Sequence, residues 1–222
     1  MQRLTLIRHA TTAAVRAAAF PVDEPLDDAG RAAASALQGQ AGRGEALCGP
    51  SRRARETARL LGLDAEPVRA LDECDFGAWR GRTLEELHEE QPESVGAWLE
   101  APGSSPHGGE SLIAFGARVG AWLDERASID GWTVAVTSGG VIRAAVVHAL
   151  GAGPEATWRI DTTPLHATVL HAHDGRWTVR SVNAPLAPSP KPGRSSGAER
   201  ASRATRSAPD SRSAPADGGV VA

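Results

Sequence analysis

The sequence has few of the features that mark disulfide-stabilised, secreted or membrane-spanning proteins. Its 222 residues include only two cysteines, Cys48 and Cys74, which lie far apart and form no C-x-x-C pair. No apolar run approaches the ~18 residues of a membrane span. The first residues, MQRLTLIRHATT, contain no uninterrupted apolar segment of signal-peptide length. We therefore expect reduced thiols and a soluble, cytoplasmic protein.

Clustered basic residues are also lacking in the main part of the chain. The formal net charge is −3, but residues 187–222 carry six basic and three acidic side chains, which leaves −6 on the first 186 residues. An acidic body argues against a nucleic-acid-binding surface, which needs grouped lysines and arginines. We expect neither a nucleic-acid nor a membrane partner, and the sequence leaves the oligomeric state open.

The composition changes sharply near residue 185. Residues 187–222 are rich in Pro, Ser, Ala, Arg and Gly and hold almost no large apolar side chain. Such a segment cannot bury enough surface to offset the entropy lost on ordering. We expect one domain over residues 1–186 and a disordered tail over residues 187–222; a basic tether for an acidic partner is the alternative for the tail.

Short apolar runs alternate with helical patterns before that change. Buried strands are expected at residues 4–8, 46–49 and 133–137, and a hairpin at 167–173 and 176–182 across Asp174-Gly175. Helices are expected after Asp28, at 53–61, at 84–100 with a break at Pro92, from Ser111 onward, and at 141–150. This alternation predicts an α/β fold, a three-layer α/β/α sandwich around a mostly parallel sheet.

Polar residues follow three of the predicted strands. The first strand runs into Arg8 and His9, the second reaches Arg53, and the third is followed by Gly139-Gly140 and a helix. The carboxyl ends of parallel strands share one edge of a sheet, where ligands bind. Helix N-termini and paired guanidinium groups both suit an anion, so we expect a phosphoryl group there.

His9 is the expected nucleophile at this edge. A neutral imidazole nitrogen is a competent nucleophile near pH 7, provided that its other nitrogen is held by a fixed acceptor such as a backbone carbonyl. The leaving oxygen then needs a proton from a carboxylic acid. The turn-rich segment 70–81 (ALDECDFGAWRG) offers Asp72, Glu73 and Asp75.

Four motifs resemble the histidine phosphatase superfamily, which includes cofactor-dependent phosphoglycerate mutases and alpha-ribazole phosphatases. They are LIRHATT (6–12), PSRRARETA (50–58), LDECDFGAWRG (71–81) and PHGGES (106–111), and LDDAG (26–30) stands where the family has Leu-Thr-x-x-Gly. The resemblance covers residues 3–183 and implies a phosphoglycerate mutase-like fold. It also implies that Arg8 and Arg53 bind phosphate and that Glu73 is the general acid.

Two positions depart from the family pattern. Ala10 replaces the glycine of the Arg-His-Gly motif, a change that is tolerable where φ is negative. Ser138 stands where the family places a second histidine before Gly-Gly. A serine hydroxyl is a shorter, uncharged donor, and losing one preorganised donor costs a factor on the order of 10²–10³ in rate. His107 and His166 are candidates to supply the missing donor, although exposed loop positions are the simpler interpretation.

The resemblance therefore implies a metal-independent phosphomonoester hydrolase without a cofactor, acting on a small phosphorylated metabolite through a phosphohistidine. His9, Glu73 and Ser138 are the expected catalytic residues; Arg8, Arg53, Thr11 and Gly139 are expected to bind substrate. The alternative is a degenerate member that binds a phosphorylated ligand or a protein without efficient turnover.

Other residues near these motifs are given simpler interpretations. Arg143 is expected to be an exposed helix charge, with substrate recognition as the alternative. Trp79 is expected in the core or at the wall of the substrate pocket. The short connection between Trp79 and Ser111 leaves little room for a large capping insertion, so a fairly open pocket is expected. Cys48 is expected to be a small buried residue.

Overall fold

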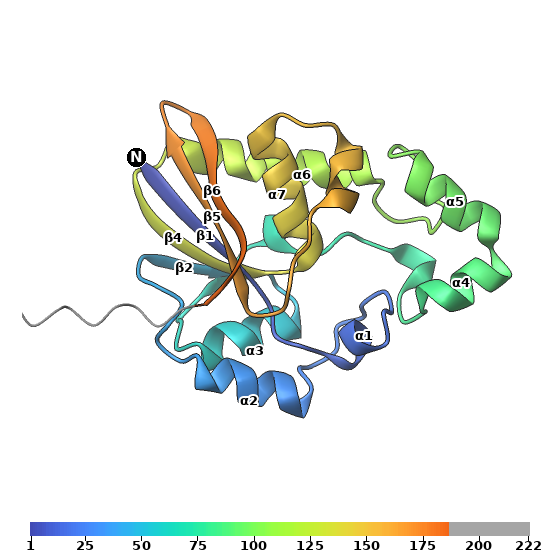
Figure 1. Ribbon diagram of the computed structural model, residues 1–222, viewed down its shortest axis with the longest axis horizontal. Coiled ribbons are helices and arrows are strands. Elements are labelled where there is room, and N and C mark those ends of the chain that lie inside the picture. Colours follow the sequence, from blue (N-terminus) through green and yellow to red (C-terminus); the bar gives the residue numbers. More distant parts are fainter. Residues whose placement is uncertain (187–222) are drawn as a thin grey trace, which may run out of the picture. The chain divides into compact units, whose positions relative to one another are not determined.

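A six-stranded sheet forms the centre of the computed structural model, which describes residues 1–186 (Figure 1). The predicted tail at 187–222 lies outside the described residues. The strands are β1 (Gln2–Arg8), β2 (Glu45–Cys48), β3 (Glu66–Pro67), β4 (Gly131–Thr137), β5 (His166–His173) and β6 (Arg176–Pro185), in the order β3-β2-β4-β1-β5-β6.

Parallel pairing brings three strand ends to one level. β1 pairs with β4 so that Arg8 lies opposite Thr137, and β2 pairs with β4 so that Cys48 lies opposite Val136. The hairpin β5–β6 is antiparallel to β1. Its turn residues Asp174 and Gly175 have φ of 50° and 72°, the positive values that a tight two-residue hairpin turn requires. The predicted mostly parallel α/β sheet is confirmed.

Helices cover both faces of this sheet. The helices are α1 (Ala13–Arg16), α2 (Asp28–Ala36), α3 (Arg52–Leu60), α4 (Leu84–Glu90), α5 (Pro92–Glu100), α6 (Leu112–Ala127) and α7 (Gly139–Leu150), with 3-10 turns η1 (Arg69–Leu71), η2 (Gly77–Trp79) and η3 (Pro154–Arg159). None of the helices between residues 1 and 186 is long and apolar enough to span a bilayer.

The alternation of side chains along β1 divides the core between the two faces. Leu4 and Leu6 pack with side chains of α6 and α7, whereas Ile7 packs with side chains of α3 on the opposite face. Both sets are fully or almost fully buried. The sheet is therefore held rigidly between two helical layers, which fixes the positions of the residues that follow its strands.

The segment between Trp79 and Ser111 forms α4 and α5, which lie beside the sheet rather than over it (Figure 1). Thr83 caps α4 through a reciprocal capping box with Glu86, and Pro92 occupies the first turn of α5, where a proline needs no N–H partner. An aromatic cluster joins these helices to the loop that carries Phe20. The two short helices thereby add a wall beside the edge at which β1, β2 and β4 end.

Candidate active site

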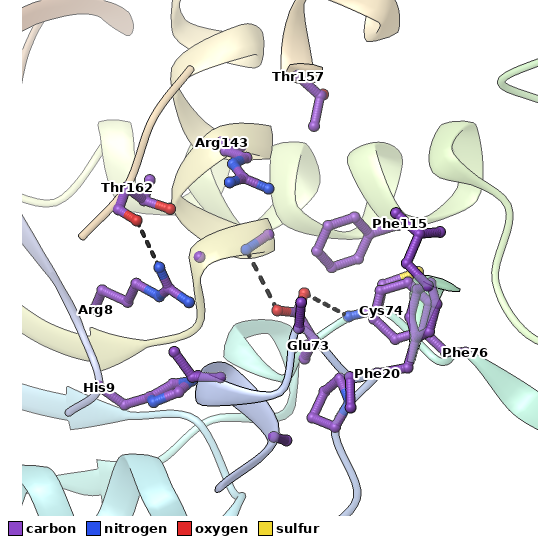
Figure 2. A pocket seen from close by; sticks show the side chains of 18 of the residues that line it. Arg8, His9, Phe20, Glu73, Cys74, Phe76, Phe115, Arg143, Thr157 and Thr162 are labelled. Carbon is purple, nitrogen blue, oxygen red and sulfur yellow. Dashed lines mark hydrogen bonds between the residues drawn. The ribbon is translucent and has the colours of Figure 1, made fainter. Parts of the chain in front are cut away.

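The edge at the carboxyl ends of β1, β2 and β4 holds a cavity of about 310 Å³. Arg8 and His9 reach it from the end of β1, Arg53 from the first turn of α3, and Gly139 from the start of α7. Glu73 enters from the segment between η1 and η2 (Figure 2). Five residues expected from sequence to act together thus line one cavity.

His9 is held in one orientation by backbone groups. Its main-chain N–H donates to the carbonyl of Thr137 at 2.8 Å, and its Nδ1 lies 2.8 Å from the carbonyl oxygen of Ala10. A carbonyl only accepts, so Nδ1 carries the proton and Nε2 keeps its lone pair for the cavity. The ring is 4% exposed. This is the tautomer that a nucleophilic imidazole needs.

Burial and the nearby Arg53 and Arg8 lower the pKa of His9 to about 3, against the opposing effect of its hydrogen bond to Ala10. The ring therefore stays neutral throughout the ordinary pH range.

We expect this shift to make the folded protein lose stability as the pH falls below about 6.5, the usual pKa of histidine. Between there and pH 3 the unfolded chain binds a proton at His9 and the folded chain does not, so the free energy of unfolding decreases by up to ~1.4 kcal/mol per pH unit. His9→Asn should reduce this slope in urea titrations at several pH values. His173→Asn, on the exposed hairpin, is the matched control; equal slopes in wild type and His9→Asn would contradict the assignment.

Two guanidinium groups flank the imidazole and are themselves fixed. Nη1 of Arg8 donates to the carbonyl of Thr162 at 2.5 Å, and Nη1 of Arg53 donates to the carbonyl of Val22 at 2.7 Å. Arg53 also lies 3.6 Å from the carboxylate of Glu24. The Nε atoms of both arginines are buried and have no partner within residues 1–186. Guanidinium groups that are held in place and keep unpaired N–H donors suit the oxygens of a phosphoryl group.

Arg143 adds a third cation that the sequence analysis expected on an exposed helix surface. It stands one turn after Gly139 on α7, lines the cavity, and donates from Nε to the carbonyl of Ile160 at 3.0 Å. Burial lowers the pKa of Arg8, the carboxylate of Glu73 raises it, and the positive charge of Arg143 lowers it. Its position four residues after Gly139, on the same face of the helix, is the sequence feature that could have indicated that Arg143 lines the cavity.

Glu73 lies across the cavity from the strand ends. Its Oε1 accepts from the N–H of Cys74 at 2.9 Å and its Oε2 from the N–H of Gly140 at 3.3 Å (Figure 2). A Cβ atom at position 140 would collide with Oε1 of Glu73. The missing side chain of Gly140 therefore lets this carboxylate approach the start of α7.

Arg118 of α6 holds the segment that carries Glu73. Its guanidinium donates to the carbonyls of Ala70, Asp72 and Glu73 at 3.0, 3.1 and 3.3 Å, and it pairs with both carboxylate oxygens of Glu110 at 2.8 Å. Glu110 in turn accepts from the N–H of Asp75 at 3.1 Å. The segment has little regular structure of its own, so this network sets its position.

Ser138 lies directly before the cavity-lining glycine but does not itself line the cavity. It is the N-terminal capping residue of α7, it is 4% exposed, and its hydroxyl has no hydrogen-bond partner within residues 1–186. Neither alternative donor replaces it: His107 is buried against Phe76 and Trp79, and His166 lies at the start of β5, both outside the cavity lining.

One further expectation differs from the structure. Thr11 lies outside the cavity, and its hydroxyl donates to the carboxylate of Asp27 at 2.9 Å, so its side chain organises the loop before α2 instead. Trp79 is 1% exposed and belongs to the core, the first of its two expected places, whereas Trp98 of α5 lines the cavity. Cys48 is buried and free, as expected.

Comparisons with known proteins point to one family. The profile of the histidine phosphatase superfamily (branch 1) matches residues 4–185. The bifunctional protein Rv2228c of Mycobacterium tuberculosis is 36% identical over 160 residues, which are 68% of this chain and 44% of that protein. This chain therefore spans less than half the length of the first curated relatives that it matches.

Two solved structures share the fold over most of both chains. The mycobacterial glucosyl-3-phosphoglycerate phosphatase is 26% identical, with a TM-score of 0.73 over 83% of this chain and 100% of that one. A putative alpha-ribazole-5'-P phosphatase from Escherichia coli is 25% identical, with a TM-score of 0.75 over 86% and 99%. Together with the profile match, this likeness means that the chain belongs to the histidine phosphatase superfamily, branch 1.

Proposed function

We propose that the protein hydrolyses phosphomonoesters of small metabolites through a phosphohistidine formed on His9. The observation that carries this proposal is the neutral His9 ring, fixed by the carbonyl of Ala10 so that Nε2 faces a cavity lined by Arg8 and Arg53. The phosphatase names of two similar solved structures support it.

The reaction takes two steps. Nε2 of His9 attacks phosphorus while the P–O bond to the alcohol breaks, and Glu73 gives its proton to the departing oxygen. Water then attacks phosphorus and breaks the P–N bond, and the Glu73 carboxylate takes the proton that the water releases. Arg8 and Arg53 stabilise the charge on the phosphoryl oxygens in both steps. The residues end in their starting protonation states.

Trapping the intermediate tests this proposal. Radiolabelled para-nitrophenyl phosphate is mixed rapidly with the protein and quenched in base, which preserves phosphohistidine. We expect label on the wild-type chain that acid removes, together with a burst of nitrophenolate, and no label on His9→Ala. Turnover with equal rates in both proteins would contradict the assignment of His9.

Ser138 favours a second candidate function, binding without efficient turnover. Ser138 stands where the resemblance implies a second histidine, and its hydroxyl neither lines the cavity nor finds a partner in the described part of the chain. A cavity that retains Arg8 and Arg53 can still bind a phosphorylated ligand. Saturable binding of inorganic phosphate without any labelled intermediate would support this candidate over the first.

A further inference from the structure

The cavity has two chemically different ends. Charged and polar groups from the strand ends and α7 form one end. The opposite wall is apolar and comes from the loop around α1, from α4 to α6, and from η3. Its largest side chains are Phe20, Phe76, Leu84, Trp98, Phe115 and Trp158. Figure 2 shows Arg8 and His9 on one side and the phenyl rings of Phe20, Phe76 and Phe115 on the other.

Within residues 1–186, the arginines that line the cavity come from β1, α3 and α7, on the side of His9. Arg143 donates to the carbonyl of Ile160, two residues before the carbonyl of Thr162 that accepts from Arg8. Glu24 faces Arg53 at 3.6 Å. No charged side chain lines the apolar wall within the described residues. A substrate whose phosphoryl group occupies the polar end therefore meets no cation for a second anionic group at the other end.

The aromatic wall is built before any ligand arrives. The ring centroids of Phe20 and Phe76 lie 4.7 Å apart with the rings tilted at 56°. Those of Trp98 and Trp158 lie 4.9 Å apart in an edge-to-face arrangement. Trp98 also meets Phe20 at 5.5 Å, which links the rings into one continuous surface. Such contacts hold the rings in fixed orientations, so a bound apolar group loses little of its binding energy to rearrangement.

Backbone hydrogen bonds fix the loop that presents Phe20. Its N–H donates to the carbonyl of Arg82 at 2.8 Å, and its carbonyl accepts from the N–H of Gly81 at 2.8 Å. Ala19 forms an isolated antiparallel bridge with Thr83 next to them. Backbone hydrogen bonds therefore hold the loop that carries Phe20 against the residues that precede α4.

We infer that the phosphomonoester bound here has an apolar, aromatic leaving group with no second anionic group. That the ligand is hydrolysed rests on the proposed function, whereas the chemical class of the ligand is inferred from the cavity alone. An aromatic ring gains both apolar burial and edge contacts against the wall. A carboxylate in the same place loses its water and finds no partner, which is costly.

Two phosphonates test this preference without any chemistry, because a C–P bond is not hydrolysed. Naphthylmethylphosphonate carries an aromatic group, and 3-phosphonopropionate carries a carboxylate. In calorimetric titrations of the wild-type protein we expect the naphthyl compound to bind about tenfold more tightly or better. Equal affinities, tighter binding of the carboxylate compound, or no binding of either would overturn the inference.

Variants of the aromatic wall test whether these side chains cause the preference for the naphthyl compound. Trp98→Ala and Trp158→Ala should each weaken binding of naphthylmethylphosphonate by roughly three- to tenfold and leave binding of inorganic phosphate unchanged. Trp158 is 39% exposed, so its variant is expected to fold even if Trp98→Ala does not. Trp132→Ala, on an exposed position of β4, is the matched control. An equal loss in the control, or a loss for phosphate as well, would contradict the assignment.

The result separates the two proposals. Selective binding of the naphthyl compound by a protein that forms no phosphoenzyme would keep the inferred ligand class and refute the hydrolase. Turnover of phosphoserine and 1-naphthyl phosphate with equal kcat/KM would keep the hydrolase and refute the ligand class.

Discussion

Ser138→His is expected to raise phosphatase turnover by a factor on the order of 10²–10³. Position 138 lies between Thr137, opposite Arg8 in the sheet, and Gly139, which lines the cavity. The serine hydroxyl there is buried without a partner in the described residues, so its replacement breaks no hydrogen bond. An imidazole reaches farther and can donate to a phosphoryl oxygen at the start of α7, where the helix dipole favours negative charge.

Steady-state kcat with para-nitrophenyl phosphate measures this effect. Ser138→Ala is the matched control, and we expect it to leave kcat nearly unchanged because the hydroxyl donates to no group described here. A folded Ser138→His protein with wild-type kcat would mean that another group already supplies the donor. A large loss in Ser138→Ala would mean that the serine hydroxyl itself contacts the substrate.

Glu73→Gln is expected to lower kcat by about 10²–10⁴ for alkyl phosphates and far less for para-nitrophenyl phosphate. An alkoxide is a poor leaving group that needs a proton, whereas nitrophenolate departs without one. The Gln side chain keeps the shape of Glu73 and can still accept from the N–H of Cys74 or Gly140. The variant therefore removes the transferable proton while leaving the segment in place.

The dependence on the leaving group is the decisive measurement. Gly140→Ala should also lower kcat more for alkyl phosphates than for para-nitrophenyl phosphate, because its Cβ would displace Oε1 of Glu73. Asp75→Asn is the matched control, because Asp75 is exposed, pairs with Arg80 and lies outside the cavity lining. If Asp75→Asn shows the larger dependence, or if Glu73→Gln slows both substrates equally, Glu73 is not the general acid.

The sequence predicted most of the fold because its apolar patterns are local. Strands at 4–8 and 133–137 are short apolar runs, and the turn at Asp174-Gly175 has a strong hairpin signature, so each is decided by neighbouring residues. The helix α1 and the two-residue strand β3 were missed. They are too short to show a period, and tertiary contacts determine them.

The placement of Arg8, His9, Arg53 and Gly139 in one cavity followed from a rule about sheets. Each residue ends a parallel strand, directly follows one, or lies in the first turn of the next helix, and such positions meet at one edge of the sheet. Their catalytic roles stay predictions until the variants are measured. This argument needs only that the strands run parallel, which the alternation of strands and helices predicted.

The apolar wall could not be predicted in the same way. Trp98 and Trp158 are 60 residues apart and meet only because α5 and η3 both lie beside the catalytic edge. Nothing in the local pattern separates Trp98, which lines the cavity, from Trp79, which is in the core. Thr11 shows the opposite error. Its place in a motif predicted a contact with the ligand, but its hydroxyl donates to the carboxylate of Asp27.

Arg118 donates to the carbonyl oxygens of Ala70, Asp72 and Glu73, so α6 helps to set the position of the proposed general acid, Glu73. The segment that carries Glu73 is thus held by α6, a helix of which only Leu112 and Phe115 line the cavity. Under the proposed mechanism, substitutions that tilt α6 would change proton transfer by Glu73 while the sheet keeps the arginines and His9 in place. The proposed nucleophile and the proposed proton donor could then change independently in evolution, one with the strands and the other with α6.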